Sequence, residues 1–216
     1  MFTRGFFLHH FFVDISKKPY IWQIKFQMKE GIILGNPKFD ITIQRLCHQL
    51  IENHNDFSNS VLIGLQPRGI YLATRIQAQL QQLLPKKTIN LGQLDVTFFR
   101  DDFRHRANPL VPNATQIDFI IENKKVILID DVLFTGRTIR AGMDAMLAFG
   151  RPAKVELLVL IDRRYTRHLP IEPDYVGHAI DSISSEKVIV KWKETEGKDE
   201  VVLISENNLT NQKKQK

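Results

Sequence analysis

The stretch Val126-Ile127-Leu128-Ile129-Asp130-Asp131-Val132-Leu133-Phe134-Thr135-Gly136-Arg137-Thr138 decides the fold of this chain. Its first four residues are apolar and partly β-branched, which predicts a short buried strand in a covered sheet. Residues 139–149 then show the apolar spacing of a helix. A strand that runs through an acidic pair and a small-residue turn into a helix is typical of an α/β fold, in which ligands bind at the carboxyl ends of strands.

The end of this strand predicts a phosphate–ribose site. Backbone N–H groups of the turn and of the helix N-terminus attract a phosphate, and Gly136 permits close approach. Thr135 and Thr138 add hydroxyl donors, while Asp130 and Asp131 can accept hydrogen bonds from vicinal sugar hydroxyls. The alternative is ordinary α/β architecture in which the acids cap the helix. A Walker loop is excluded, because Gly-x-x-x-x-Gly-Lys does not occur in the chain.

The length of 216 residues predicts one domain with a covered sheet and a real core. The hydrophobic fraction of 43% and the charged fraction of 25% are ordinary for a globular protein. The single cysteine, Cys47, excludes an intramolecular disulfide and indicates a reducing, cytoplasmic compartment. Cys47 lies in a helical apolar pattern, so we expect a small buried residue there. A formal charge of +6 suits anionic partners such as phosphates or RNA. No span approaches the length of a transmembrane helix.

Both ends of the chain look different from its centre. Residues 1–27 are interpreted as an N-terminal extension, with Met28 as a candidate for the natural start. The apolar run 6–13 is interrupted by His9 and His10 and lacks a clear cleavage site, which makes it a weak signal peptide. We expect a domain over 28–205 and a polar basic tail over 206–216.

Two helices and a strand are predicted ahead of the central stretch. The spacing from Phe39 to His54 predicts a helix whose polar faces carry Arg45, His48 and His54. These three side chains are expected on a solvated surface, or as part of an RNA-facing patch. Residues 60–65 predict a buried strand, and residues 70–84 a helix stopped by a proline.

The motif Pro67-Arg68-Gly69 lies between that strand and the second helix, where backbone N–H groups converge. Arg68 offers a forked donor suited to a diphosphate. Alone this motif is often only a turn, but its place one βα unit before the central stretch favours a second ligand loop.

A long charged segment precedes the central strand. Residues 88–92 and 94–99 predict strands near a sheet edge. Arg100, Asp101 and Asp102 then open a charged and Pro/Asn-rich run that continues to Asp118. Loops of that length are uncommon unless functional, which predicts a mobile flap able to exclude water from the reaction. The alternative is a solvated β-arm.

After the central helix, residues 155–161 predict another buried strand, which ends in Asp162 and Arg163. Residues 169–177 and 187–192 are expected to form a small hood over the site. Tyr175 could stack on a base and the backbone of Val176 could pair with the polar edge of a pyrimidine, although simple packing is an alternative for an aromatic residue beside a glycine.

Five stretches carry a resemblance that runs from Met28 to Ile204. They are Leu65–Ala73 (LQPRGIYLA), Asp95–Asp102 (DVTFFRDD), Asp130–Ala145 (DDVLFTGRTIRAGMDA), Gly150–Ala153 (GRPA) and Leu169–Gly177 (LPIEPDYVG). The chain resembles the pyrimidine operon attenuation proteins, which are type I phosphoribosyltransferases. The resemblance implies an α/β fold with a central, mostly parallel sheet flanked by helices, a small hood and a flexible β-arm or flap.

The resemblance also implies two activities. One is Mg²⁺-dependent transfer from phosphoribosyl diphosphate to uracil, giving UMP and diphosphate. The other is uridine-nucleotide-dependent binding (UMP or UTP) to pyrimidine operon mRNA, by a homodimer or higher homo-oligomer. An enzyme without RNA regulation, and an RNA-binding regulator with vestigial catalysis, are the alternatives.

Site residues follow from the matched motifs. Four are expected to be catalytic: Asp130, Asp131, Arg68 and Arg100. The expected substrate-binding residues are Pro67, Gly69, Asp101, Asp102, Val132, Leu133, Phe134, Thr135, Gly136, Arg137, Thr138, Asp162, Arg163, Tyr175 and Val176. Arg45 and His48 are the candidates for RNA. Mg²⁺ is expected to arrive with the diphosphate rather than on a protein site of its own.

Phe134 departs from the purine-salvage members of the wider family, which commonly have an acid just before the Thr-Gly turn. A phenyl ring cannot transfer protons, which argues against hypoxanthine or guanine as the substrate. It also leaves no general base visible for uracil.

Overall fold

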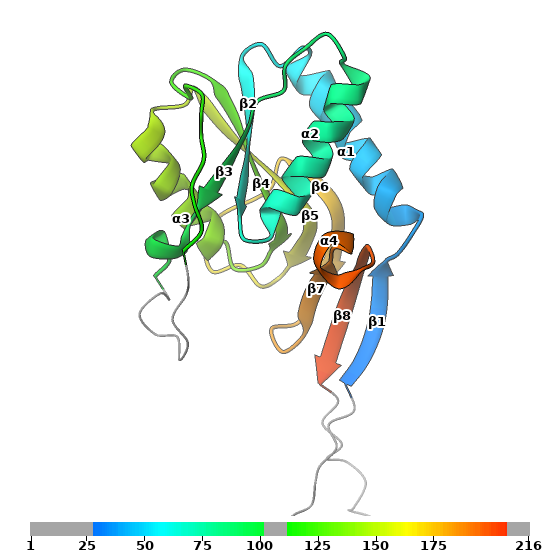
Figure 1. Cartoon of the computed structure of the whole chain (residues 1–216). Helices are drawn as coiled ribbons and strands as arrows, with labels where there is room; N and C mark the ends of the chain where they lie inside the picture. Colours follow the sequence, from blue (N-terminus) through cyan, green and yellow to red (C-terminus); the bar gives the residue numbers. More distant parts are fainter. Residues whose placement is uncertain (1–27, 102–111, 207–216) are drawn as a thin grey trace, which may run out of the picture.

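A computed structural model of the chain describes residues 28–101 and 112–206. Within them, five parallel strands form the main sheet in the order β3-β2-β4-β5-β6, and three antiparallel strands form a second sheet in the order β1-β8-β7 (Figure 1). The strands are β1 (Met28–Leu34), β2 (Ser60–Gln66), β3 (Leu91–Asp95), β4 (Lys125–Leu133), β5 (Lys154–Arg164), β6 (Tyr175–Asp181), β7 (Lys187–Lys191) and β8 (Glu200–Glu206). The helices are α1 (Lys38–His54), α2 (Gly69–Leu83), α3 (Arg137–Met146) and α4 (Lys193–Glu196), with short 3-10 turns at Thr97–Phe99 and Leu147–Phe149. This is the α/β architecture that the sequence predicts.

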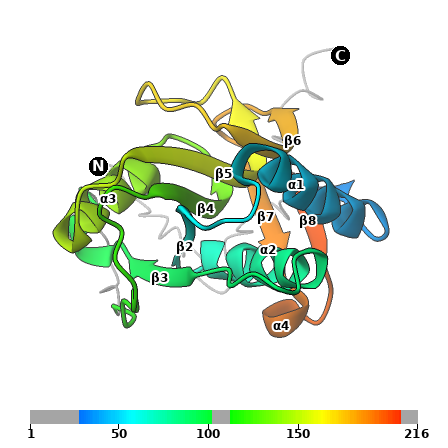
Figure 2. The same cartoon turned by 90° about the horizontal axis from the view of Figure 1, so that it is seen from above.

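Helices cover both faces of the main sheet, which is why its central strands are apolar throughout rather than alternating. Every residue of β2 is buried. Leu62 and Ile127 belong to the core on the side of α1 and α2, whereas Val61 and Val126 belong to the core on the side of α3. Figure 2 shows α1 and α2 on one side of the sheet and α3 on the other.

The second sheet forms the hood, and it combines both ends of the described chain. β1 precedes α1, yet it pairs with β8, so that Met28 lies opposite Glu206. The predicted hood segment 187–192 is confirmed as β7. The placement of 175–177 in the hood is wrong, because β6 pairs in parallel with β5 and completes the main sheet. Gly177 permits this pairing, since a Cβ there would lie 2.4 Å from the carbonyl oxygen of Leu160.

The predicted helices agree with α1 and α2, while α3 ends earlier than expected, at Met146. The strand predicted over 94–99 is only half correct. β3 stops at Asp95, whose carboxylate accepts hydrogen bonds from the Thr97 amide (2.9 Å) and hydroxyl (2.6 Å). Such local bonds compete with the sheet ladder and turn Thr97–Phe99 into a 3-10 helix.

His54 is buried, so its expected place on a solvated surface is wrong. It lies in the last turn of α1, where its ring contacts Ser60 Oγ at 2.8 Å, Glu156 Oε2 at 2.9 Å and Tyr175 Oη at 3.1 Å. Three polar partners compensate the ring for the loss of water. Cys47 is buried as expected, and burial raises the pKa of its thiol to about 12.

The predicted extension (1–27), most of the predicted flap (102–111) and nearly all of the tail (207–216) lie outside the described residues. The chain re-enters at Pro112, and Gln116 pairs with Gln93 of β3 through two backbone hydrogen bonds of 2.7 and 2.8 Å. Of the helices described, none has the length and apolar character needed to cross a bilayer.

Candidate functional site

All parallel strands of the main sheet end at the same edge, which brings distant turns together. The turn after β2 holds Arg68, the turn after β4 holds Gly136, and Leu133 lies in register with Asp162 near the end of β5. The hood lies beyond this edge (Figure 1). A crevice at the carboxyl ends of the strands is where α/β sheets bind ligands.

The acidic pair is buried at this edge. Asp130 and Asp131 are 7% and 9% exposed. Asp130 Oδ1 accepts the Asp131 amide at 2.9 Å, and Asp131 Oδ1 accepts the Val132 amide at 2.8 Å. Burial, with a further contribution from the Asp131 carboxylate, raises the pKa of Asp130. Burial also raises the pKa of Asp131, although Arg68 opposes it. Two adjacent carboxylates that are buried from water favour ligands that bring hydroxyl donors or positive charge.

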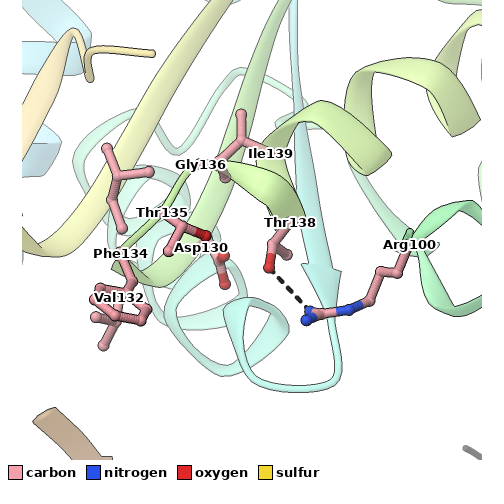
Figure 3. A pocket seen from close by; sticks show the side chains of 9 residues that line it. Arg100, Asp130, Val132, Phe134, Thr135, Gly136, Thr138 and Ile139 are labelled. Atoms are coloured by element: carbon pink, nitrogen blue, oxygen red, sulfur yellow. Dashed lines mark hydrogen bonds between the residues drawn. The ribbon is translucent and has the colours of Figure 1, made fainter. Parts of the chain in front are cut away.

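The turn from Thr135 to Thr138 leads into α3 and lies beside Asp130. Gly136 has a φ of 88°, in the left-handed region that glycine adopts without strain. The helix that follows has ten residues, so its N-terminal N–H groups and dipole favour an anion. Thr138 Oγ1 accepts a hydrogen bond from Arg100 Nη1 at 3.0 Å (Figure 3).

These groups line a cavity of about 100 Å³. Its lining residues are Arg100, Asp130, Val132, Leu133, Phe134, Thr135, Gly136, Thr138 and Ile139. Figure 3 shows two different sides: Val132 and Phe134 lie on one, Thr138 and Arg100 on the other, and Asp130 lies between them. The cavity is therefore apolar at one end, acidic in the middle and rich in N–H and hydroxyl donors at the other end.

Arg68 connects the second turn to the acids and to the hood. Its Nε donates to Asp131 Oδ2 at 3.3 Å, and its other nitrogens donate to Glu196 Oε1 at 3.3 Å and to the carbonyl of Val190. The side chain is 37% exposed, so solvent can reach it. It follows Pro67, which is exposed in the same turn.

Gly69 allows the two turns to touch. A Cβ at this position would lie 2.5 Å from the Ile129 carbonyl oxygen and 2.9 Å from Asp130 Cα. Because both atoms belong to the backbone, they cannot rotate away. The absence of a side chain at Gly69 thus sets how closely α2 approaches the acidic pair.

Several predicted ligand residues bond within the chain instead. Asp162 is buried and pairs with Arg167, and Arg163 is 4% exposed with its donors directed at residues 182–186. Neither lines the cavity, which disfavours direct substrate contact from these two residues. Asp101 pairs with Arg137 at the start of α3, and Asp102 lies outside the described residues.

The position of Tyr175 favours the alternative of simple packing over stacking on a base. The ring is 6% exposed and belongs to the core, and its hydroxyl donates to Glu156 Oε2 at 2.8 Å. Tyr175 is the first residue of β6 and lies in register with Leu158 of β5. Sequence alone could not decide this, because an aromatic residue before a glycine fits both a stacking platform and a core position.

The carbonyl of Val176 is already occupied. Arg45 Nη2, from α1, donates to it at 3.0 Å and also to the Gly177 carbonyl. Arg45 Nη1 reaches Gln49 at 3.3 Å. This arrangement disfavours both the proposed pairing of Val176 with a base through its carbonyl and the use of Arg45 as a free phosphate contact. His48 is exposed on the same helix.

Sequence reasoning missed Arg167, whose side chain donates to the backbone just before the turn from Thr135 to Thr138. Its guanidinium donates to the carbonyls of Leu133 (3.2 Å), Phe134 and Ile171 (3.0 Å). The backbone amide of His168 adds a 3.0 Å bond to the Thr135 carbonyl. No local pattern marks such a residue, because Leu133 and Phe134 lie more than 30 residues before it. Within residues 28–101 and 112–206, no three His, Cys, Asp or Glu side chains gather as a metal site.

The chain is similar to known proteins over most of its length. Residues 30–195 match the family described as Phosphoribosyl transferase domain. The chain is 40% identical to the "Bifunctional protein PyrR" of Elusimicrobium minutum, over 83% of this chain and 99% of that protein. It is 41% identical to the protein of the same name from Bacillus subtilis, over 83% and 98%.

Solved structures show the same fold at low identity. The hypoxanthine phosphoribosyltransferase of Trypanosoma cruzi matches with a TM-score of 0.61 and 16% identity, covering 82% of this chain and 97% of that one. The Staphylococcus aureus enzyme matches with a TM-score of 0.59 and 17% identity, covering 79% and 90%. The central parallel sheet with its flanking helices is therefore the type I phosphoribosyltransferase fold.

Proposed function

The chain belongs to the phosphoribosyl transferase domain family and is related over most of its length to the bifunctional PyrR proteins, and from that premise we propose that it is a uracil phosphoribosyltransferase that also regulates pyrimidine-biosynthesis genes by binding their mRNA. The reaction joins uracil to the ribose of phosphoribosyl diphosphate. Its products are UMP and diphosphate.

The observation that carries the enzymatic half is the division of the cavity. The donors around Thr138 and the N-terminus of α3 suit the 5′-phosphate, and the acid Asp130 suits the ribose hydroxyls. The apolar side at Val132 and Phe134 suits a flat base. A nucleoside monophosphate has these three parts in this order.

The chemistry follows from charge. The bond between C1′ and the diphosphate oxygen breaks with its electron pair going to the diphosphate, and N1 of uracil forms the new bond to C1′ as its proton leaves to solvent. Positive charge develops on the ribose ring during this exchange. The buried carboxylates of Asp130 and Asp131 stabilise that charge strongly, because little water screens them.

Phe134 fits a pyrimidine better than a purine acceptor. Its ring lines the cavity where a carboxylate could otherwise accept a proton from the base. Since no such acid is present at this position, base selection rests on shape and stacking.

Arg68 is proposed to serve the diphosphate. It is partly exposed and beside Asp131, so it can turn from Glu196 toward a bound anion. Mg²⁺ would arrive on the diphosphate of the substrate, which would supply most of its oxygen ligands, and the carboxylates of Asp130 and Asp131 could complete the set. When bound, this ion neutralises charge on the departing diphosphate.

The regulatory half is proposed from the relationship to the PyrR proteins. Strong, salt-dependent RNA binding needs clustered Lys or Arg. The candidate face on α1 offers Arg45 and His48, and Arg45 is held by the carbonyls of Val176 and Gly177. That observation favours one alternative, an enzyme that has lost RNA regulation. Assembly as a homodimer or larger homo-oligomer, and a cytoplasmic location, complete the proposal.

The test is UMP formation from uracil, phosphoribosyl diphosphate and Mg²⁺, run beside hypoxanthine, guanine and orotate. Product from uracil alone supports the enzyme. Binding to pyrimidine operon mRNA is then measured over a salt series with and without UMP. Turnover without UMP-dependent RNA binding would leave the salvage enzyme, and UMP-dependent RNA binding without turnover would leave a regulator.

A further inference from the structure

Arg163 stacks on Phe134. The centre of its guanidinium lies 4.0 Å from the centroid of the phenyl ring. Arg163 is 4% exposed, whereas Phe134 is 36% exposed and lines the cavity. A desolvated cation over an aromatic face is a favourable contact, and here it links a buried side chain to a wall of the ligand site.

The guanidinium is fixed from its other side by hydrogen bonds. Nε donates to Ser182 Oγ at 2.8 Å, and Nη2 donates to the carbonyls of Ile183 (3.0 Å) and Glu186 (2.9 Å). These three acceptors belong to the connection between β6 and β7. A planar group with its donors satisfied in this way has little freedom to rotate, so the ring that rests on it is also restrained.

Restraint of that ring matters for a base. Phe134 and Val132 form the apolar side of the cavity, opposite Thr138 and Arg100 (Figure 3). Stacking requires a flat surface held at the right tilt, and a surface phenyl group without support samples several rotamers. A support behind the ring therefore improves base binding without touching the base.

We propose that Arg163 is a positioning residue for the base subsite: through its stacking on Phe134 and its bonds to residues 182–186, it holds the ring against which the base of the nucleotide packs. This inference rests on the proposed function, because it assumes that the apolar side of the cavity receives the base. It gives Arg163 a role that is different from direct contact with substrate.

The test compares two probes by calorimetry. UMP and ribose 5-phosphate share the phosphorylated sugar, but only UMP carries a base. Arg163→Gln should weaken UMP binding about fivefold, since only part of the energy of the cation–π contact is transmitted to the base, and should leave ribose 5-phosphate binding unchanged. Arg163→Lys keeps the cation but loses the planar fork, so it should fall between the wild type and Arg163→Gln.

Matched controls separate this role from folding. Arg164→Gln changes the next residue, which is exposed and pairs with Asp181 at 2.8 Å, and should leave both probes at wild-type affinity. If Arg163→Gln does not fold, Ser182→Ala removes one acceptor and keeps the guanidinium. That variant should weaken UMP about twofold, again without an effect on ribose 5-phosphate.

A double-mutant cycle shows whether Arg163 acts through Phe134. Phe134→Leu alone should weaken UMP about tenfold, and Arg163→Gln should add almost nothing in that background. Additive losses, or equal weakening of UMP and ribose 5-phosphate, would overturn the inference, as would a wild-type chain that binds both probes equally. Turnover is scored separately: a chain that binds UMP in this pattern but makes none refutes the proposed catalysis and not the role of Arg163.

Discussion

Replacement of Gly69 by alanine tests how the two ligand turns are held together. The new Cβ would lie 2.5 Å from the Ile129 carbonyl oxygen and 2.9 Å from Asp130 Cα. Ordinary contact begins at 3.4 Å, so the closer atom must recede by about 0.9 Å. Both obstacles are backbone atoms of β4, which is paired on both sides in the sheet. We therefore expect α2 and the turn at Arg68 to move away from the acidic pair.

The cost can be estimated in two quantities. Overpacking of this kind destabilises by about 2 kcal/mol, which for a chain of this size lowers the melting temperature by roughly 6 °C. A displacement of about 1 Å between catalytic groups costs about 100-fold in rate. Gly69→Ala should therefore fold, melt earlier and lose about 100-fold in kcat/KM for UMP formation. Calorimetric unfolding and steady-state kinetics on the same preparation measure the two effects.

Gly31→Ala is the matched control, because no atom lies within 4 Å of a Cβ built at Gly31. It makes the same chemical change in β1 of the hood, and both measurements should stay near the wild type. If Gly69→Ala also kept wild-type stability and kcat/KM, the close approach of the two turns would not be important for the site. A loss of stability with full activity would instead show that the acids do not need the present spacing.

Three further outcomes follow from the charges. Because burial and the Asp131 carboxylate raise the pKa of Asp130, this carboxyl contributes stability below its ordinary pKa of 3.8 that is lost as the pH rises through the folded value. Asp130→Asn should therefore be inactive yet have a higher free energy of unfolding than the wild type near neutral pH, a gap that closes in acid denaturation curves. Burial lowers the pKa of His54 from 6.5, although Glu156 opposes this shift. The neutral ring therefore contributes stability that is complete above pH 6.5 and is lost as the pH falls through the folded pKa. Urea titrations at several pH values should detect this loss in the wild type and not in His54→Gln. Arg68→Ala should raise the KM for phosphoribosyl diphosphate about tenfold, with a smaller change in the KM for uracil. A variant with the wild-type KM for phosphoribosyl diphosphate would show that Arg68 does not bind the diphosphate.

The fold and the centre of the site could be predicted from short stretches of consecutive residues. The run from Val126 to Thr138 holds a strand, an acidic pair, a turn and a helix start in consecutive residues, so its structure depends little on distant contacts. The same is true of the turn at Pro67 to Gly69. Eight of the nine cavity-lining residues were among the predicted site residues, several of them, such as Arg100, only through the resemblance; Ile139 was the ninth.

Pairings between distant segments could not be predicted in this way. β1 joins the hood because it pairs with β8, at the other end of the described chain. His54 occupies a polar position on a helix, yet Ser60, Glu156 and Tyr175 close around it. A buried polar residue with partners from other strands has the same local pattern as an exposed one, because periodicity records only the faces of its own helix.

The arginines at the sheet edge show the same limit in chemical terms. Arg68 and Arg163 both follow or end a buried strand, and both were predicted to bind substrate. Arg68 is about one-third exposed, and two of its three partners, Asp131 and Glu196, are carboxylates that a diphosphate can replace; the third is the Val190 carbonyl. Arg163 is 4% exposed, and its N–H groups donate hydrogen bonds to two backbone carbonyls and a buried hydroxyl. Moving it toward an anion would leave those acceptors unpaired in a dry environment, at a cost of about 1–3 kcal/mol for each. We therefore propose that burial and the replaceability of the partners, which cannot be read from a motif, distinguish an arginine that binds a ligand from one that positions a neighbouring side chain.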